Sequence, residues 1–152
     1  MMNKRGIEAL VATVLLVLIV IAAVGIIWGA VMPIIKQNID TSQKCLNTGI
    51  EINAESGYTY FIGGGVNNVS VQVSRGPSTI EVTNIAIKVI DSTGNSNSSL
   101  QSDVPSQNSD KVYVLKMSDL GLTGTAKRVG VAPTIVIGKT NVACPMKEVD
   151  LP

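Results

Sequence analysis

The feature that most constrains this chain is an apolar run of 24 residues near its N-terminus, from Ala9 to Met32. Fourteen of these residues are Ile, Leu or Val, and none is charged. At about 1.5 Å per residue, a helix of this length measures roughly 36 Å, slightly more than the hydrocarbon thickness of a bilayer. A helix at the surface of a soluble core would keep a polar stripe, which this run lacks. The run therefore predicts a membrane helix, and the alternative is a buried helix of a globular core.

A secretory signal that is cleaved on the far side of the membrane is a second alternative. Such a signal has an apolar stretch of about 7–15 residues followed by a small-x-small site. Here the stretch is longer, and Ala23 and Ala30 have the bulky Ile21 and Trp28 two positions earlier. We therefore expect the helix to be retained. The cations Lys4 and Arg5 favour a cytoplasmic N-terminus, which places the rest of the chain outside the cell.

The segment from Lys4 to Leu16, KRGIEALVATVLL, resembles the N-terminus of archaeal type IV pilins and of the related archaellins. In that family a prepilin peptidase removes a short basic leader after a glycine, and the retained helices bundle as the core of a filament. The resemblance implies a leader peptide of residues 1–6. It implies these partners: copies of the chain itself, prepilin peptidase, the pilus assembly machinery and, before assembly, the membrane. The implied processing site comprises Lys4, Arg5, Gly6, Ile7 and Glu8.

One position departs from the pattern of bacterial-type pilins, which have a glutamate at the fifth mature residue. This chain has Val11 there, and Glu8 is the second mature residue instead. A carboxylate in the first turn of a helix is also stabilised by the helix dipole alone. A role of Glu8 in assembly and a purely local role therefore both stay open.

Small residues in the apolar run indicate where helices can approach one another closely. Ala22, Gly25 and Gly29 have this character, and the two glycines form a GxxxG motif. Farther on, Pro33 predicts a kink or an end of the helix, since proline lacks a backbone donor. We expect a helix over residues 7–46 with a kink near Pro33. Its last part, with Ile35, Ile39 and Leu46 at helical spacing, is predicted to pack on the following domain.

Residues 47–152 predict an extracellular β-rich domain, because apolar residues alternate with polar ones. The alternation changes phase between Val82 and Ile85, which predicts a bulge near Thr83-Asn84. The polar stretch of about residues 91–110 predicts a flexible loop. The predicted fold class is α+β: a long N-terminal hydrophobic helix followed by an all-β, sandwich-like domain. Expected strands include Ile50 and Ile52, Tyr58–Ile62, Val69–Val73, Ile80–Val89, Val112–Met117, Val129–Val131 and Thr134–Ile137.

Two cysteines and two sequence triplets suggest covalent modification. Cys45 and Cys144 form an even pair in a domain expected outside the cell, which predicts a disulfide; two separate thiols are the alternative. Asn68-Val69-Ser70 and Asn97-Ser98-Ser99 fit the N-glycosylation pattern, so Asn68 and Asn97 are candidate glycosylation sites.

The composition argues against an enzyme. There is no histidine, the commonest general base and metal ligand, and only five aromatic residues are present. The net charge of +1 suggests no nucleic-acid partner. Gly63-Gly64-Gly65 lacks the other residues of a phosphate-binding loop. We therefore expect no catalytic, cofactor or metal site, and a structural subunit of a pilus-like filament that serves adhesion or motility. The alternative is a membrane-anchored extracellular binding domain that does not polymerise.

Overall fold

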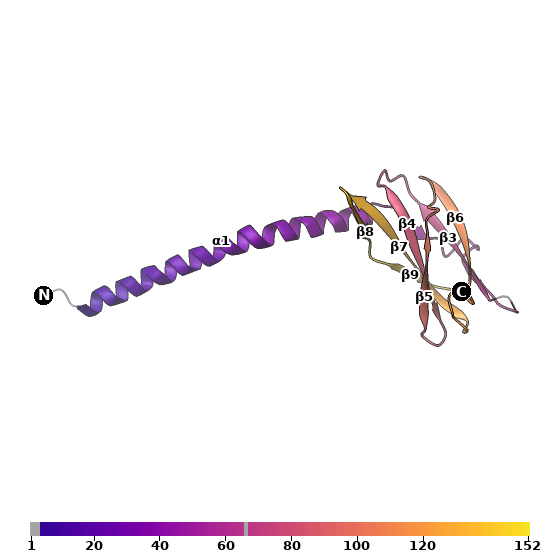
Figure 1. The fold of residues 1–152 in the computed structure, drawn as a ribbon, viewed down its shortest axis with the longest axis horizontal. Coiled ribbons are helices and arrows are strands. Elements are labelled where there is room, and N and C mark those ends of the chain that lie inside the picture. The colour runs from indigo at the N-terminus through magenta and orange to yellow at the C-terminus, as the bar shows by residue number, and fades with distance from the viewer. Residues whose placement is uncertain (1–3, 66) are drawn as a thin grey trace. The chain divides into compact units, whose positions relative to one another are not determined.

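The computed structural model describes residues 4–65 and 67–152, with side chains from Val11 onward. The chain divides into two compact units, Met1–Thr41 and Ser42–Pro152, which are considered separately. The described residues of the first unit belong to helix α1, which spans Lys4–Leu46 and also supplies the first residues of the second unit. The second unit contains all nine strands of the described residues (Figure 1).

Helix α1 continues through Pro33 and ends only at Leu46. The helix therefore reaches residue 46 as expected and does not end at this proline, while a kink there stays a prediction. Proline removes one backbone hydrogen bond, and the long helical sequence on both sides tolerates that loss. Leu46 is 71% exposed, so the domain covers little of its side chain. The packing expected for Ile35 and Ile39, which lie in the first unit, stays a prediction.

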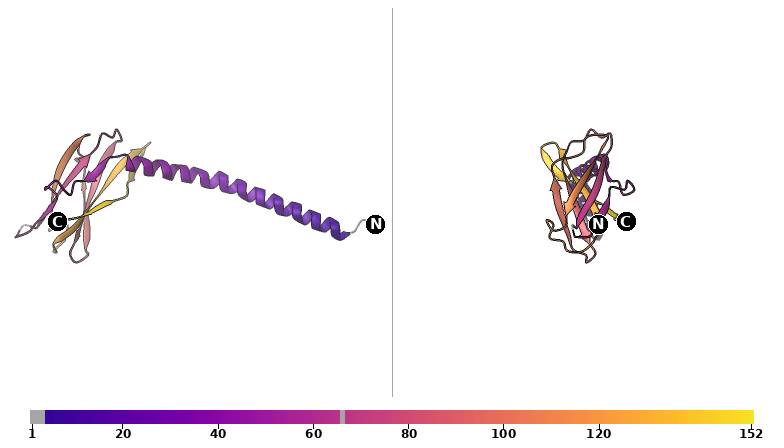
Figure 2. Two further views of the ribbon diagram at one scale, coloured as in Figure 1. Left: turned by 180° about the vertical axis from the view of Figure 1, so that it is seen from behind. Right: turned by 90° about the vertical axis from the view of Figure 1, so that its right-hand side faces the viewer.

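The second unit consists of two antiparallel sheets that share one core (Figure 1, Figure 2). In the first sheet, β3 (Asn68–Arg75) is central and β6 (Ser109–Lys116) pairs along one edge. Along the other edge, β1 (Ile50–Ile52) and β2 (Tyr60–Ile62) pair with opposite ends of β3. This sheet matches the expected strands closely, although β2 is shorter than predicted.

The second sheet is built on β4 (Val82–Asp91) and β7 (Ala126–Ile137). The outer edge of β4 pairs with β5 (Ser96–Gln101), and the outer edge of β7 pairs with β8 (Thr140–Ala143) and β9 (Lys147–Asp150). The predicted α+β fold class, with one long helix and two antiparallel sheets, is thus confirmed.

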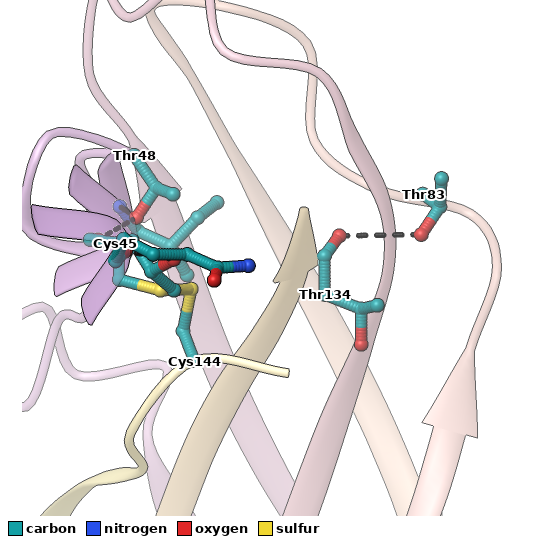
Figure 3. Close-up of a disulfide and its surroundings, with 8 residues drawn as sticks. Cys45, Thr48, Thr83, Thr134 and Cys144 are labelled. Atoms are coloured by element: carbon teal, nitrogen blue, oxygen red, sulfur yellow. Dashed lines mark hydrogen bonds between the residues drawn. A yellow bond between two sulfur atoms is a disulfide. The ribbon is translucent and has the colours of Figure 1, made fainter. Parts of the chain in front are cut away.

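The core lies where the inward side chains of the two sheets meet. Period-two alternation gives β3, β4 and β7 one apolar face each, and these faces are buried. The fully buried apolar side chains include Val69, Val71 and Val73 of β3, Ile85, Ile87 and Val89 of β4, and Val129, Val131 and Ile135 of β7. The predicted phase change is also present, since the β4–β7 register shifts between Val82 and Asn84. Thr83 fills this irregularity by donating its hydroxyl to the carbonyl oxygen of Thr134 at 3.2 Å (Figure 3).

The prediction of a loop over about residues 91–110 is wrong in its centre, because β5 pairs there with β4. Asp91 starts the turn: its Oδ1 accepts hydrogen bonds from the backbone amides of Thr93 and Asn95 and from the Thr93 hydroxyl. Gly94 completes it at φ +87°, a conformation that glycine adopts at little cost. An edge strand with exposed side chains needs no apolar alternation, so sequence pattern alone misses it.

Candidate assembly helix and the disulfide of the domain

From Val11 to Ile35, the surface of α1 is apolar on all sides. From Val11 to Ile35, its large apolar side chains are between 36% and 70% exposed. Residues Val11–Leu46 form a helix that is long and apolar enough to cross a membrane, with a mean hydropathy of 3.0 in its best window and none of that window buried. Apolar surface of this extent is unfavourable in water. The helix therefore requires lipid or other protein around it.

Among the described residues, neither Gly25 nor Gly29 of α1 is packed against another side chain. A side chain added at Gly25 or at Gly29 would meet nothing within 4 Å. Each glycine in a helix interior costs about 1 kcal/mol relative to alanine. Ala22, Gly25 and Gly29 are three and four residues apart, so they share one face of the helix. A flat face of this kind permits close contact with another helix, and the assigned packing role stays a prediction.

The expected processing site falls at the start of α1. The backbone of residues 4–8 is helical, whereas the side chains of Lys4, Arg5, Ile7 and Glu8 lie outside the described residues. Residues 1–3 of the expected leader also lie outside them. Cleavage after Gly6 therefore stays a prediction.

The predicted disulfide between Cys45 and Cys144 is confirmed, with an S–S distance of 2.03 Å and 5.4 Å between the Cα atoms (Figure 3). Cys45 lies in the last turn of α1, where its carbonyl oxygen accepts a hydrogen bond from the Thr48 hydroxyl at 2.8 Å. Gly49 then turns the chain into β1 at φ +65°, and its carbonyl oxygen accepts a hydrogen bond from the amide of Gly76. Both cysteines are 7% exposed, so the bond is part of the core.

A bulge brings Cys144 to its partner. β8 and β9 run along the same edge of β7, and between them the three residues 144–146 face only Ala132 and Pro133. The Cys144 amide donates to the Pro133 carbonyl oxygen at 2.8 Å. The extra residue bends the strand away from β7 at this point. In an antiparallel strand the N–H and C=O of one residue point to the same neighbouring strand. Proline has no N–H, and at Pro133 the position without a donor faces the bulge, where a ladder hydrogen bond is not needed. Strands β8 and β9, which the sequence pattern does not indicate, thus position Cys144 for the disulfide.

A pocket of about 230 Å³ lies beside the disulfide within the domain. It is lined by both cysteines and by apolar residues that include Leu46, Ile50 and Met146. Its rim carries Lys147, whose Nζ lies 3.0 Å from Oε1 of Glu51. The lining holds no carboxylate, and its polar side chains are the hydroxyls of Ser42 and Thr48 and the amine of Lys147.

The pKa values of Tyr113 and Arg128 are shifted by burial, hydrogen bonds and nearby charges within the fold. Burial, and secondarily the charge of Asp103, raises the pKa of Tyr113 to about 12. Its hydroxyl donates to the backbone carbonyl of Asp103, while the Asp103 carboxylate pairs with Lys111. The pKa of Arg128 is raised, first by its hydrogen bond to Asp150. Among the described residues, no group of three or more Cys, Asp or Glu is placed to hold a metal ion.

The two glycosylation triplets lie in different environments. Asn68 starts the central strand β3, where it is opposite Ile62 of β2 and Lys116 of β6, and it is half-buried. Asn97 lies on the edge strand β5 and is exposed.

No known protein family, curated protein or solved structure matches this chain. The class of protein must therefore be inferred from the architecture itself. A long, exposed apolar helix followed by a disulfide-bonded β-domain is consistent with the architecture of type IV pilins.

Proposed function

We propose that this chain is the structural subunit of an archaeal type IV pilus-like surface filament that serves adhesion or motility. A prepilin peptidase cleaves it after Gly6, and the apolar helix then moves from the membrane into a bundle formed by the helices of other copies. The observation that carries the proposal is the exposure of α1 on every side. A dimer would cover a single stripe of such a helix, whereas lipid or a bundle of many copies covers all of it.

The energetics of α1 are compatible with both environments. The 14 Ile, Leu and Val residues of the apolar run favour membrane insertion by roughly 6 kcal/mol in sum. Exchange of lipid for the apolar side chains of other helices leaves this contribution nearly unchanged, because hydrocarbon tails and leucine side chains are similarly apolar. Close packing at the face of Ala22, Gly25 and Gly29 then favours the bundle.

The alternative function is a membrane-anchored binding domain that does not polymerise. One feature of the domain favours it: the outer face of the first sheet exposes Tyr60 by 41% and Val114 by 59%, on either side of the buried Ser70. Apolar side chains on an open sheet face are a common feature of binding surfaces.

Substitution of Gly6 tests the processing step. We expect the natural protein to begin at Ile7 and the surface fraction to contain filaments. A Gly6→Val variant should keep residues 1–6 and form no filaments, as measured by intact mass, N-terminal sequencing and negative-stain microscopy. Gly63→Ala is the control, because a side chain at Gly63 meets only an ordinary contact of 3.4 Å with Phe61. Cleaved protein and normal filaments in the Gly6 variant would contradict the proposal.

Substitution of the helix glycines separates the two functions. Gly25→Leu with Gly29→Leu keeps the helix apolar but adds bulk to its small-residue face. A filament subunit should lose assembly, whereas a solitary anchor should be unaffected. Ala30→Leu makes a similar change about 100° around the helix and should assemble normally. Normal filaments in the double glycine variant would show that this face is not a packing surface.

A further inference from the structure

The outer faces of the two sheets differ in what they present to solvent. On the first sheet, where β3 and β6 lie side by side (Figure 1), Tyr60, Val112 and Val114 are 41%, 42% and 59% exposed. They surround Ser70 and Gln72 of β3, and we call the three exposed side chains the apolar patch. The outer face of the second sheet instead carries a network of ion pairs: Lys88–Glu148, Arg128–Glu148 and Arg128–Asp150. The first sheet therefore offers the less charged surface to a partner.

A polar pocket of about 410 Å³ adjoins the apolar patch. Asn68 and Lys116 line it, and they are direct neighbours in the register of β3 and β6. Because side chains two residues apart share one face of a strand, Asn68 and Lys116 lie on the same outer face as Ser70 and Val114. The rest of the lining includes neutral polar side chains and one leucine: Asn67, Ser118, Leu122 and Thr123. We call this pocket the Lys116 pocket.

Two groups in the Lys116 pocket lack a partner. The Oδ1 of Asn68 is buried and has no hydrogen-bond partner among the described residues. None of the ion pairs between described residues includes Lys116. An unpaired buried acceptor is destabilising. The terminal torsion of asparagine is soft, so a rotation of the amide can bring Oδ1 to a donor in the pocket. The pocket therefore suits a ligand that donates to Asn68 and accepts from Lys116.

The charges around the pocket favour a neutral ligand. The described lining residues include no carboxylate. Asp119 borders the adjacent groove together with Lys116, so its charge offsets that of the ammonium group. Hydroxyl groups both donate and accept hydrogen bonds, which matches a lining of amides, hydroxyls and one ammonium group. The apolar patch beside the pocket suits a ligand that also has a hydrocarbon face. Sugars combine hydroxyl groups with a face of C–H bonds.

We propose that the Lys116 pocket and the apolar patch together bind a neutral saccharide. The pocket holds the hydroxyl groups of one sugar unit, and the ring of Tyr60 packs against the C–H face of a neighbouring unit. The inference names the target of the adhesive role proposed above and rests on that role. It requires the domain to lie outside the cell, and it does not require polymerisation.

Binding of the full chain in detergent to an array of neutral and acidic glycans tests the site. We expect the wild type to bind a set of neutral glycans. Lys116→Met and Thr123→Val should each weaken this binding by about tenfold or more, because each removes a hydrogen bond to the sugar. Lys139→Met is the matched control, since it removes the same charge from an exposed turn outside the pocket. Circular dichroism checks that all variants are folded.

Four results would overturn the inference. The first is an absence of glycan binding by the wild type. The second is unchanged binding in both pocket variants. The third is binding to acidic glycans alone that Lys139→Met weakens equally, which indicates attraction by net charge. The fourth is retention on polystyrene beads that depends on Tyr60 without any glycan binding, which assigns the patch to an apolar partner.

The glycan result is separable from the filament proposal. The array measures the protein in detergent, whereas the Gly6 and helix-glycine experiments measure cleavage and assembly. Normal filaments made by a protein that binds no glycan would overturn the saccharide site and leave the filament proposal in place. Glycan binding by a protein that never polymerises would do the reverse.

Discussion

Helix α1 and the β-sandwich use the same side chains in opposite ways. Ile19 and Ile26 of the helix are 67% and 70% exposed, whereas Ile85 and Ile87 of β4 are completely buried. In the sandwich, alternation along each strand gives two apolar faces that cover one another. In the helix, apolar residues occupy every face, so no single partner element can cover them. The domain therefore buries its core side chains within one chain, whereas the apolar side chains of the helix can be covered only by lipid or by other protein.

Loss of the disulfide is the largest change that we expect within the sandwich. The bond joins residues 99 positions apart, and the chain-entropy model for a loop of about 100 residues gives about 4.7 kcal/mol. Cys45→Ser with Cys144→Ser should lower the free energy of unfolding by about 2–5 kcal/mol, as measured by denaturant unfolding in detergent with circular dichroism. Wild-type protein in reductant should match the variant; an unchanged midpoint after reduction would contradict the stabilising role.

A pair of isoleucine substitutions tests the comparison directly. Ile85→Ala should cost about 2–5 kcal/mol of unfolding free energy, because it leaves a cavity in a closed core. Ile19→Ala should change the unfolding of the domain by no more than about 0.5 kcal/mol, because Ile19 is exposed. Denaturant unfolding of the two variants under the same conditions provides the measurement. If both variants lost the same unfolding free energy, Ile19 would contribute to the stability of the domain as much as Ile85 does, which would contradict the comparison.

Asp91 should make the stability of the sandwich dependent on pH. Hydrogen bonds, first that of the Thr93 hydroxyl, lower the pKa of Asp91 from its ordinary value of 3.8. A lowered pKa adds stability above pH 3.8 that is lost as the pH falls through the lower folded value. Wild type should therefore exceed Asp91→Asn in stability at pH 7, and the difference should shrink at pH 2. Thermal unfolding at both pH values measures this.

A carboxylate outside the β4–β5 turn serves as the control for Asp91. Asp119 is exposed, and its carboxylate accepts a hydrogen bond of 3.3 Å from the Ser118 hydroxyl. Because its side chain is exposed, Asp119→Asn should keep the stability of the wild type at pH 7. A difference between wild type and Asp91→Asn that stays constant from pH 7 to pH 2 would exclude the ionised carboxylate as the cause.

The smallest effect is expected at the Lys147–Glu51 ion pair. The side chains are 44% and 70% exposed, and pairs of this kind contribute about 0–1 kcal/mol. A double-mutant cycle with Lys147→Ala and Glu51→Ala should give a coupling energy below about 1 kcal/mol that disappears in high salt. A larger coupling that resists salt would show that this side of the sandwich is held by charge as well as by the disulfide.

The sequence predicts those parts of the fold whose pattern reflects burial. The alternation in β3 and β4 is visible because one face of each strand is buried, and its phase change at Thr83-Asn84 predicts the bulge. Strand β5 is missed because its stability comes from backbone pairing with β4 and from the Asp91 turn, neither of which needs apolar residues. Its polar residues also fit a loop, which explains the wrong prediction.

In the candidate site, too, the sequence predicts some features and misses those that depend on strand pairing. The disulfide partners could be predicted from the presence of two cysteines alone, whereas the bulge at residues 144–146 that joins them depends on a register between strands. The difference between Asn68 and Asn97 was not visible either, because both triplets have equivalent sequences. Their separation follows from the position of one strand at the centre of a sheet and of the other at an edge.

The bond between Cys45 and Cys144 also bears on damage by proteases. Every peptide bond from residue 46 to residue 143 lies inside the ring that this bond closes. A single cut in an exposed turn, such as the one after Asp91, would open the backbone without releasing a fragment. A surface structure built from such subunits would keep both parts of a domain cut once inside this ring, and a second cut inside the ring or a reductant would release a fragment.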